Sequence, residues 1–216
     1  MSFDGLYNLA SRVYDENNHP YHNIKHIRDM IEIAADFDLP ISRTQKLAIL
    51  FHDIIYMPFA KNNEEQSVKK MKSFFTLEDL SCYEREIIAK ASEIIMDTKT
   101  HIATIEESKT VIDLDLVSLG YTLEVFNITS ELIYIENWKV ANANKITKAN
   151  FDEIFYKETI EFAKIMLNRG REIYYNEIFN KRFNEQAHNN LEHMIDDCTN
   201  KLKNMSHKKE NGNVVI

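Results

Sequence analysis

Apolar side chains recur along most of the chain at intervals of three and four residues, which is the spacing of an amphipathic helix. This spacing predicts helices at residues 3–16, 23–37, 42–56, 64–75, 84–98, 109–119, 123–138, 148–168 and 182–203. Apolar and polar residues nowhere alternate for long enough to predict a β-strand. The pattern therefore predicts an all-α fold.

Few residues interrupt these helices, since the 216 residues include only four Gly and three Pro. Sheets joined by tight turns need more of both, so long helices with short connections are favoured. Ser42 is a typical N-cap, and Gly120 and Gly170 stand where helix C-caps are expected. Because no linker rich in Gly, Ser or Pro divides the chain, residues 1–200 are expected to form a single compact domain, followed by a polar, flexible tail at residues 201–216.

The composition narrows the range of partners. The formal net charge is -8 and no dense basic stripe is present, so a nucleic acid polymer is not expected as a partner. A small anionic ligand is compatible with this charge, because one local pocket can be positive on an acidic protein. The longest apolar stretch, residues 47–51, is too short to span a bilayer, the first residues do not resemble a signal peptide, and two isolated cysteines fit a reducing compartment. We therefore expect a cytoplasmic protein without membrane association.

The His52-Asp53 pair is the strongest chemical signal in the sequence. It lies in an almost wholly apolar stretch, residues 47–56, where an ionised carboxylate is costly unless something compensates its charge. A bound metal ion would compensate it. Alternatively, Asp53 only orients the His52 ring or ends the helix, and the pair alone does not decide between these interpretations.

Two further residues fall on apolar helix faces. His26 shares its face with Met30 and Phe37, which predicts that its ring points into the core, where a lone histidine is usually a structural residue with its hydrogen bonds satisfied. Asp113 and Asp115 point in nearly opposite directions, because they are two residues apart on a helix. Asp115 shares the more apolar face, so we predict that Asp115 is a ligand and that Asp113 pairs or caps nearby.

Two imidazoles and two carboxylates then form the predicted metal site: His26, His52, Asp53 and Asp115. The lack of sulfur ligands argues against a structural zinc finger. A site of nitrogen and oxygen donors suits Mn²⁺, Fe²⁺, Mg²⁺, Co²⁺ or Zn²⁺ and leaves coordination positions for water and substrate. We therefore expect a divalent metal ion as the cofactor.

The order His, His-Asp, Asp resembles the signature of the HD superfamily of metal-dependent phosphohydrolases, and in particular a branch of small bacterial and phage proteins. Further blocks of that branch occur in order at residues 21–26 (Tyr-His-x-x-x-His), 51–56 (Phe-His-Asp-x-x-Tyr), 63–67 (Asn-Glu-x-x-Ser), 98–101 (Thr-x-x-His), 113–120 (Asp-x-Asp-Leu-x-x-Leu-Gly) and 185–191 (Glu-x-Ala-x-x-Asn-Leu). The resemblance spans about residues 6–195. Two segments, 18–20 and 128–132, lack an Arg that the branch usually carries there.

The resemblance implies a helical HD-domain fold and hydrolysis of a nucleotide or a related small phosphate ester by a metal-activated water. A carboxylate, Asp53 or Glu64, is then expected to assist proton transfer, although Glu64 also suits the start of a helix as a favourable charge. His101 is expected to contact a substrate phosphate or a second metal ion, and its alternative role is a helix-end cap.

Three more residues are predicted to bind the substrate: His22, Tyr56 and Lys99. His22 is four residues before His26 and lies on the same helix face, but it also fits a partly exposed residue at a helix start. Lys99 is a candidate phosphate contact that would equally suit a solvated surface position.

Two other functions are compatible with these residues. Some HD proteins are di-iron oxygenases, which resemble this chain but carry two more histidines before the last Asp, whereas His101 is the only histidine between Asp53 and Asp115 here. The third reading is a non-catalytic nucleotide-binding module in which the metal ion is structural.

Overall fold

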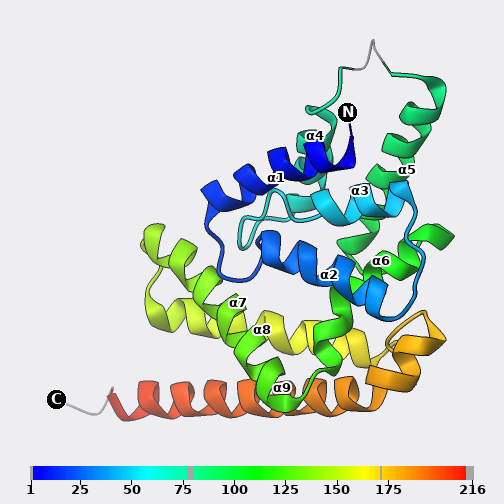
Figure 1. Cartoon of the computed structure of the whole chain (residues 1–216). Coiled ribbons are helices and arrows are strands. Elements are labelled where there is room, and N and C mark those ends of the chain that lie inside the picture. Colours follow the sequence, from blue (N-terminus) through cyan, green and yellow to red (C-terminus); the bar gives the residue numbers. More distant parts are fainter. Residues whose placement is uncertain (1, 77–79, 171, 213–216) are drawn as a thin grey trace. The chain divides into compact units, whose positions relative to one another are not determined.

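The computed structural model describes residues 2–76, 80–170 and 172–212 of the chain (Figure 1). These residues form helices and no strand, which confirms the all-α prediction. The elements in order are α1 (Phe3–Asn17), α2 (Ile24–Asp36), α3 (Arg43–Phe51), α4 (Asn63–Lys72), α5 (Cys82–Thr98), α6 (Glu106–Leu116), the 3₁₀-helix η2 (Val117–Gly120), α7 (Leu123–Ala143), α8 (Lys148–Leu167) and α9 (Glu177–Gly212).

The chain packs as two compact units, Met1–Val117 and Ser118–Ile216. The sequence pattern, from which one domain over residues 1–200 was expected, does not reveal this division, because α6 runs directly into η2 without a linker. Among the described helices, none combines the length and the apolar character that crossing a membrane requires.

Helix α3 forms the centre of the first unit, where it contacts α1, α2, α4, α5 and α6. Its apolar residues from Leu47 to Phe51 are all buried. A helix that is apolar on nearly every side is expected to be enclosed by other elements rather than to cover a surface. Ser42 caps it in a capping box with Gln45, which confirms the predicted N-cap.

The third helix ends earlier than its apolar pattern predicts. The pattern extends to residue 56, but α3 stops at Phe51. Ser67 of α4 bonds to both the N–H and the carbonyl of Ile55 at 3.2 Å. The Ser67 side chain thus bonds to backbone groups of Ile55 that would bond within the helix if α3 continued. A local sequence pattern cannot reveal such a partner. The His-Asp pair consequently stands on a turn that follows the helix.

Helices α7, α8 and α9 build the second unit, in which α8 packs against both α7 and α9 (Figure 1). Gly120 ends η2 against α9, where a Cβ would lie 2.4 Å from the Cβ of Phe183, so no side chain fits. Asn190 of α9 also holds the end of η2 against α9, because its amide donates to the carbonyls of Leu119 and Tyr121 at 2.8 Å each. These contacts give the Gly and Asn of the two C-terminal blocks a structural role.

The ends of α8 and α9 can be compared with the predicted boundaries. Gly170 lies just after α8 with φ +100, the left-handed conformation expected of a glycine that follows a helix. Helix α9 continues to Gly212, through most of the range predicted as a flexible tail. Residues 213–216 lie outside the described residues, and the flexibility of the tail stays a prediction.

Candidate metal centre

The structure brings together the four residues predicted as metal ligands. His26 comes from α2, His52 and Asp53 from the turn after α3, and Asp115 from α6. Each offers one donor atom, and these four atoms all lie within 4.8 Å of one another. Residues up to 89 positions apart therefore meet at one point, as a metal site requires.

Two side chains of α1 fix the turn that carries the His-Asp pair. The buried Tyr14 hydroxyl donates to the Leu50 carbonyl at 3.1 Å, and the Asn17 amide donates to the Ile54 carbonyl at 3.2 Å. Helix-end carbonyls need partners from outside the helix, and α1 supplies them here. Burial and the nearby charge of Asp53 both raise the pKa of Tyr14 well above its ordinary value, so the phenol stays a neutral donor. Tyr14 and Asn17 were missed at the sequence level, because only the tertiary fold pairs them with α3.

The donor atoms of the four residues lie at hydrogen-bond or ion-pair distances. His26 Nε2 is 3.1 Å from Asp115 Oδ1 and 3.9 Å from Asp53 Oδ2. His52 Nε2 is 3.0 Å from Asp53 Oδ2 and 3.5 Å from Asp115 Oδ1. Both Nε2 atoms thus face the same two carboxylate oxygens, with one oxygen contributed by each Asp.

The His52 ring is set up to offer one lone pair. Its Nδ1 lies 2.9 Å from the Ile49 carbonyl, and a carbonyl can only accept, so Nδ1 carries the proton of that hydrogen bond. Its Nε2 is buried and has no hydrogen-bond partner with suitable geometry among the described residues. A buried polar atom left in this state is costly, and a metal ion is a partner that would satisfy it. The donor set and this orphaned nitrogen therefore both fit a divalent ion.

The charges of the cluster depend on one another. Burial opposes the charge on His52, but the attraction of Asp53 and Asp115 outweighs it and raises the pKa of His52 well above its usual range. Burial would likewise raise the pKa of Asp53, yet the positive charges of His52 and His22 lower it to about 2. The pKa of Asp115 is also held well below its usual value, against the effect of burial, by the contacts of its carboxylate with His101 and His26 and by the nearby charge of His52. A bound cation would take the place of the proton on His52 Nε2.

The two aspartates of α6 differ as the helix geometry predicts. Asp115 joins the cluster, whereas Asp113 is fully buried and lies outside it. The second oxygen of Asp115, Oδ2, lies 3.4 Å from Nε2 of His101. His101 therefore touches the cluster through the Asp115 carboxylate, and its contact with a phosphate or a second metal ion stays a prediction.

Glu64 is close enough to Asp53 and Lys99 to feel the charge of both. Glu64 is half-buried in the first turn of α4, where burial raises its pKa although Lys99 opposes the change. The Lys99 ammonium donates to the Lys61 carbonyl and to the Glu65 carboxylate, both at 2.6 Å. Those contacts use two of its three ammonium protons, and the predicted contact of Lys99 with a substrate stays a prediction.

An aromatic group borders the cluster on the side of α2. The rings of His22 and Tyr56, both predicted to bind the substrate, stack with centroids 3.7 Å apart. The centroid of the His26 ring lies 6.3 Å from that of His22 and 5.2 Å from that of Tyr21. His19 adds its edge to Tyr56 at 5.8 Å, and no pattern in the sequence had pointed to it. The two predicted residues are thus brought to the site, and their contact with a substrate stays a prediction.

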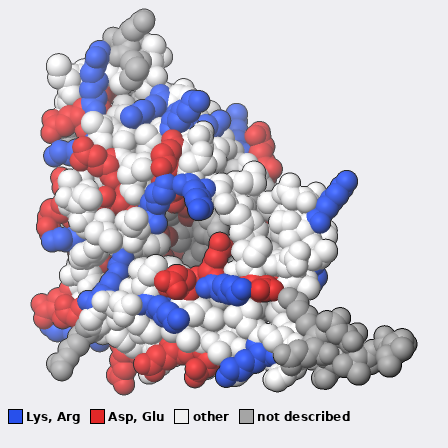
Figure 2. Space-filling model, turned by 180° about the vertical axis from the view of Figure 1, so that it is seen from behind, with Lys and Arg blue, Asp and Glu red and all other residues white. Residues whose placement is uncertain are grey.

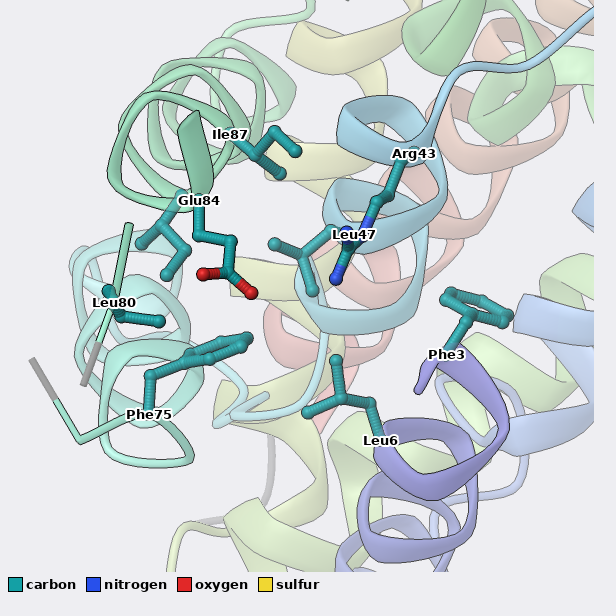
Figure 3. A pocket seen from close by; sticks show the side chains of 9 residues that line it. Phe3, Leu6, Arg43, Leu47, Phe75, Leu80, Glu84 and Ile87 are labelled. Carbon is teal, nitrogen blue, oxygen red and sulfur yellow. The ribbon is translucent and has the colours of Figure 1, made fainter. Parts of the chain in front are cut away.

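A small cavity elsewhere in the first unit belongs to none of these residues. It measures about 40 Å³ and is lined mainly by apolar side chains of α1, α3 and α5. Figure 3 shows Arg43 and Glu84 reaching into it beside Leu47 and Phe75. On the protein surface, Figure 2 shows Lys and Arg side chains interspersed with Asp and Glu over the face it displays. Neither feature adds a second group of metal-binding side chains.

Comparisons with known proteins leave the family open. No family model, curated protein or solved structure matches the chain significantly. The function must therefore be argued from the geometry of the site and from the motifs of the sequence.

Proposed function

We propose that the chain is a metal-dependent phosphohydrolase of the HD type that acts on a nucleotide or a related small phosphate ester. One observation carries the proposal: four nitrogen and oxygen donors from three separate helical segments lie within 4.8 Å of one another. The buried Nε2 of His52 supports it, because this atom makes no well-aligned hydrogen bond among the described residues although two carboxylate oxygens lie within 3.5 Å of it.

The side chains divide into ligands and helpers. His26, His52, Asp53 and Asp115 hold the ion, which when bound lowers the pKa of a coordinated water and neutralises charge on a phosphoryl oxygen. Glu64 accepts a proton from the attacking water. Its half-buried position and raised pKa suit this task, since general bases act best when their pKa is closer to neutrality.

The substrate contacts follow from the groups around the ligands. His22 and Tyr56 form the aromatic border of the site and are placed to meet the organic part of the substrate. His101 and the remaining proton of Lys99 offer donors for phosphate oxygens. Because these groups are few and local, they fit a small phosphate ester better than a polymer.

The test begins with metal binding. The purified protein should hold about one divalent ion per chain, as a single four-ligand site implies. His52→Ala and Asp53→Ala should each lose it in elemental analysis after dialysis. His193→Ala, which removes an exposed histidine of α9, serves as the control and should keep the ion. If both site variants keep full metal, the site is elsewhere.

Activity then separates the three functions. Nucleoside mono-, di- and triphosphates, cyclic nucleotides and alarmones are incubated with the protein and Mn²⁺, Mg²⁺, Co²⁺, Fe²⁺ or Zn²⁺. A phosphohydrolase releases phosphate or a phosphorylated fragment with and without oxygen, whereas a di-iron oxygenase stops in its absence. Tight nucleotide binding without any product would identify the non-catalytic module and refute the proposal.

A further inference from the structure

Asp97 closes the connection between α5 and α6. Its side chain is buried, with 5% of the residue exposed. Its Oδ2 accepts the Thr104 N–H at 2.7 Å, and its Oδ1 accepts the Thr104 hydroxyl at 2.9 Å. Thr104 directly precedes Ile105, the N-cap residue of α6, which has no side-chain cap of its own. One buried carboxylate thus joins the end of one helix to the start of the next.

His101 lies inside this connection in an unusual backbone conformation. Its φ of 53 is left-handed, which residues with a Cβ avoid unless their surroundings hold them there. From this position its Nε2 reaches Oδ2 of Asp115, whereas Oδ1 of the same carboxylate faces His26 and His52. The closed connection therefore presents His101 to the oxygen that the other two imidazoles leave open.

We propose that Asp97 is a positioning residue that, through Thr104, keeps the connection closed and so holds His101 against Asp115. The proposal rests on the proposed function only in treating Asp115 as a metal ligand. Hydrogen-bond partners of ligand side chains typically change metal affinity by about 10- to 100-fold when they are lost. Asp97 does not touch Asp115 and acts on it only through His101, so we expect an effect on metal affinity at the lower end of that range, about 10-fold.

Nuclear magnetic resonance of the metal-free, histidine-labelled protein tests the geometry directly. The ring signals of His101 are assigned by their loss in His101→Gln. Asp97→Asn and Thr104→Val should both shift these signals, because each weakens the hydrogen bonds between residues 97 and 104 while nearly preserving the shape of the side chain. Thr104→Ser retains both donors and should leave the spectrum as in the wild type. Unchanged His101 signals in both Asp97→Asn and Thr104→Val would overturn the proposal.

A variant at the other end of α5 controls for general loosening. Ser81 caps that end in a capping box with Glu84, so Ser81→Ala should lower thermal stability without moving the His101 signals. If Ser81→Ala moves them as far as Asp97→Asn does, the effect comes from loss of stability and the positioning role is refuted.

Calorimetric titration with Mn²⁺ tests the consequence for the site. Asp97→Asn should weaken binding about 10-fold, and the double variant with His101→Gln should bind no more weakly than His101→Gln alone. Additive losses would show that Asp97 does not act through His101. If the wild-type protein binds none of Mn²⁺, Fe²⁺, Mg²⁺, Co²⁺ and Zn²⁺, the proposed function fails, whereas the ring signals still decide whether Asp97 positions His101.

Discussion

Asn190 in the second unit and His52 in the first are both buried polar residues, but only Asn190 has all its described polar contacts in good hydrogen-bond geometry. The Asn190 amide donates to two carbonyls, and its Oδ1 accepts from Gln186 at 2.9 Å. Around His52, two carboxylates and two imidazoles crowd together, and one ring nitrogen lacks a hydrogen bond within the described residues. The first arrangement closes contacts between elements of the fold, whereas the second gathers opposite charges in one place, as the proposed metal site would require.

The comparison predicts opposite consequences of substitution. A group that serves the fold should cost stability when it is removed and should leave chemistry intact. A group that serves a reaction should cost turnover or metal binding and leave the metal-free fold nearly unchanged, since active sites retain locally unfavourable groups. The predictions that follow run from the largest expected effect to the smallest.

Glu64→Gln should show the contrast most strongly. Gln keeps the size of the side chain and removes only its ionisable group, so turnover should fall by about 10²- to 10⁴-fold while the metal content and melting temperature stay constant. Glu124→Gln, at an exposed position in the first turn of α7, is the matched control and should keep full activity. Equal turnover in Glu64→Gln and the wild type would reduce Glu64 to a favourable charge at a helix start.

Metal binding should stabilise only a protein with an intact cluster. At a Mn²⁺ concentration about 1,000 times the dissociation constant, binding should add about 4 kcal/mol to the free energy of unfolding, measured against a sample in chelator. Asp115→Asn should abolish most of this gain. Asp113→Asn should retain it, even though its buried position means that the metal-free protein is also destabilised. The reverse ranking of the two variants would exchange their roles.

Asn190→Ala should weaken the second unit without touching the site. It leaves two carbonyls and the Gln186 amide without their partner, at a cost of about 2 kcal/mol in urea unfolding. Asn189→Ala removes an exposed neighbour on the same helix and should change stability by less than about 0.5 kcal/mol. Metal affinity should be unaffected in both. Loss of metal on Asn190→Ala would mean that the two regions are not independent.

The pH dependence of stability should change direction with metal. Without metal, the depressed pKa of Asp53 contributes stability that is present above about pH 4 and is lost as the pH falls toward 2. The raised pKa of His52 contributes stability that is present below about pH 6.5 and is lost as the pH rises through the folded-state value. In chelator the melting temperature should therefore peak between these limits, falling on the acid side as Asp53 becomes protonated and on the alkaline side as His52 loses its proton.

With Mn²⁺ the dependence of stability on pH above about pH 6.5 should change sign. The metal takes the Nε2 lone pair only when His52 is neutral, so metal-linked stability should grow as the pH rises from 5 to 8. In chelator, His52→Ala should remove the fall in melting temperature that the wild type shows above about pH 6.5. A stability profile that is the same with and without Mn²⁺ would show that His52 does not bind it.

The sequence was informative where a local pattern decides the structure. The spacing of apolar residues located the helices, and the two-residue offset of Asp113 and Asp115 separated the residue that joins the cluster from the one that does not. It was less informative where tertiary contacts decide. The end of α3 at Phe51 depends on Ser67, a partner 12 residues beyond Ile55, and no local rule predicts that pairing.

The residues that support the site were the hardest to predict. Tyr14, Asn17 and Asp97 each act through a hydrogen bond to backbone or to a neighbouring loop, and each looks like an ordinary helical residue in the sequence. The division at Val117 was equally hidden, because the boundary between compact units falls inside continuous helical structure. Residue types and spacing predicted which side chains gather in the cluster, whereas the partners that orient them emerge only from the fold.

The Tyr14 hydroxyl bonds to a carbonyl 36 residues later in the chain, and this has a consequence for the order of assembly. Until α1 docks, the turn that carries His52 and Asp53 lacks its anchor, so a high-affinity site cannot precede that docking. Every donor of the site lies before residue 118, so the completed first unit contains all of them. During synthesis, capture of the proposed metal ion would therefore report the moment at which α1 packs against α3, while the remaining helices are still being made.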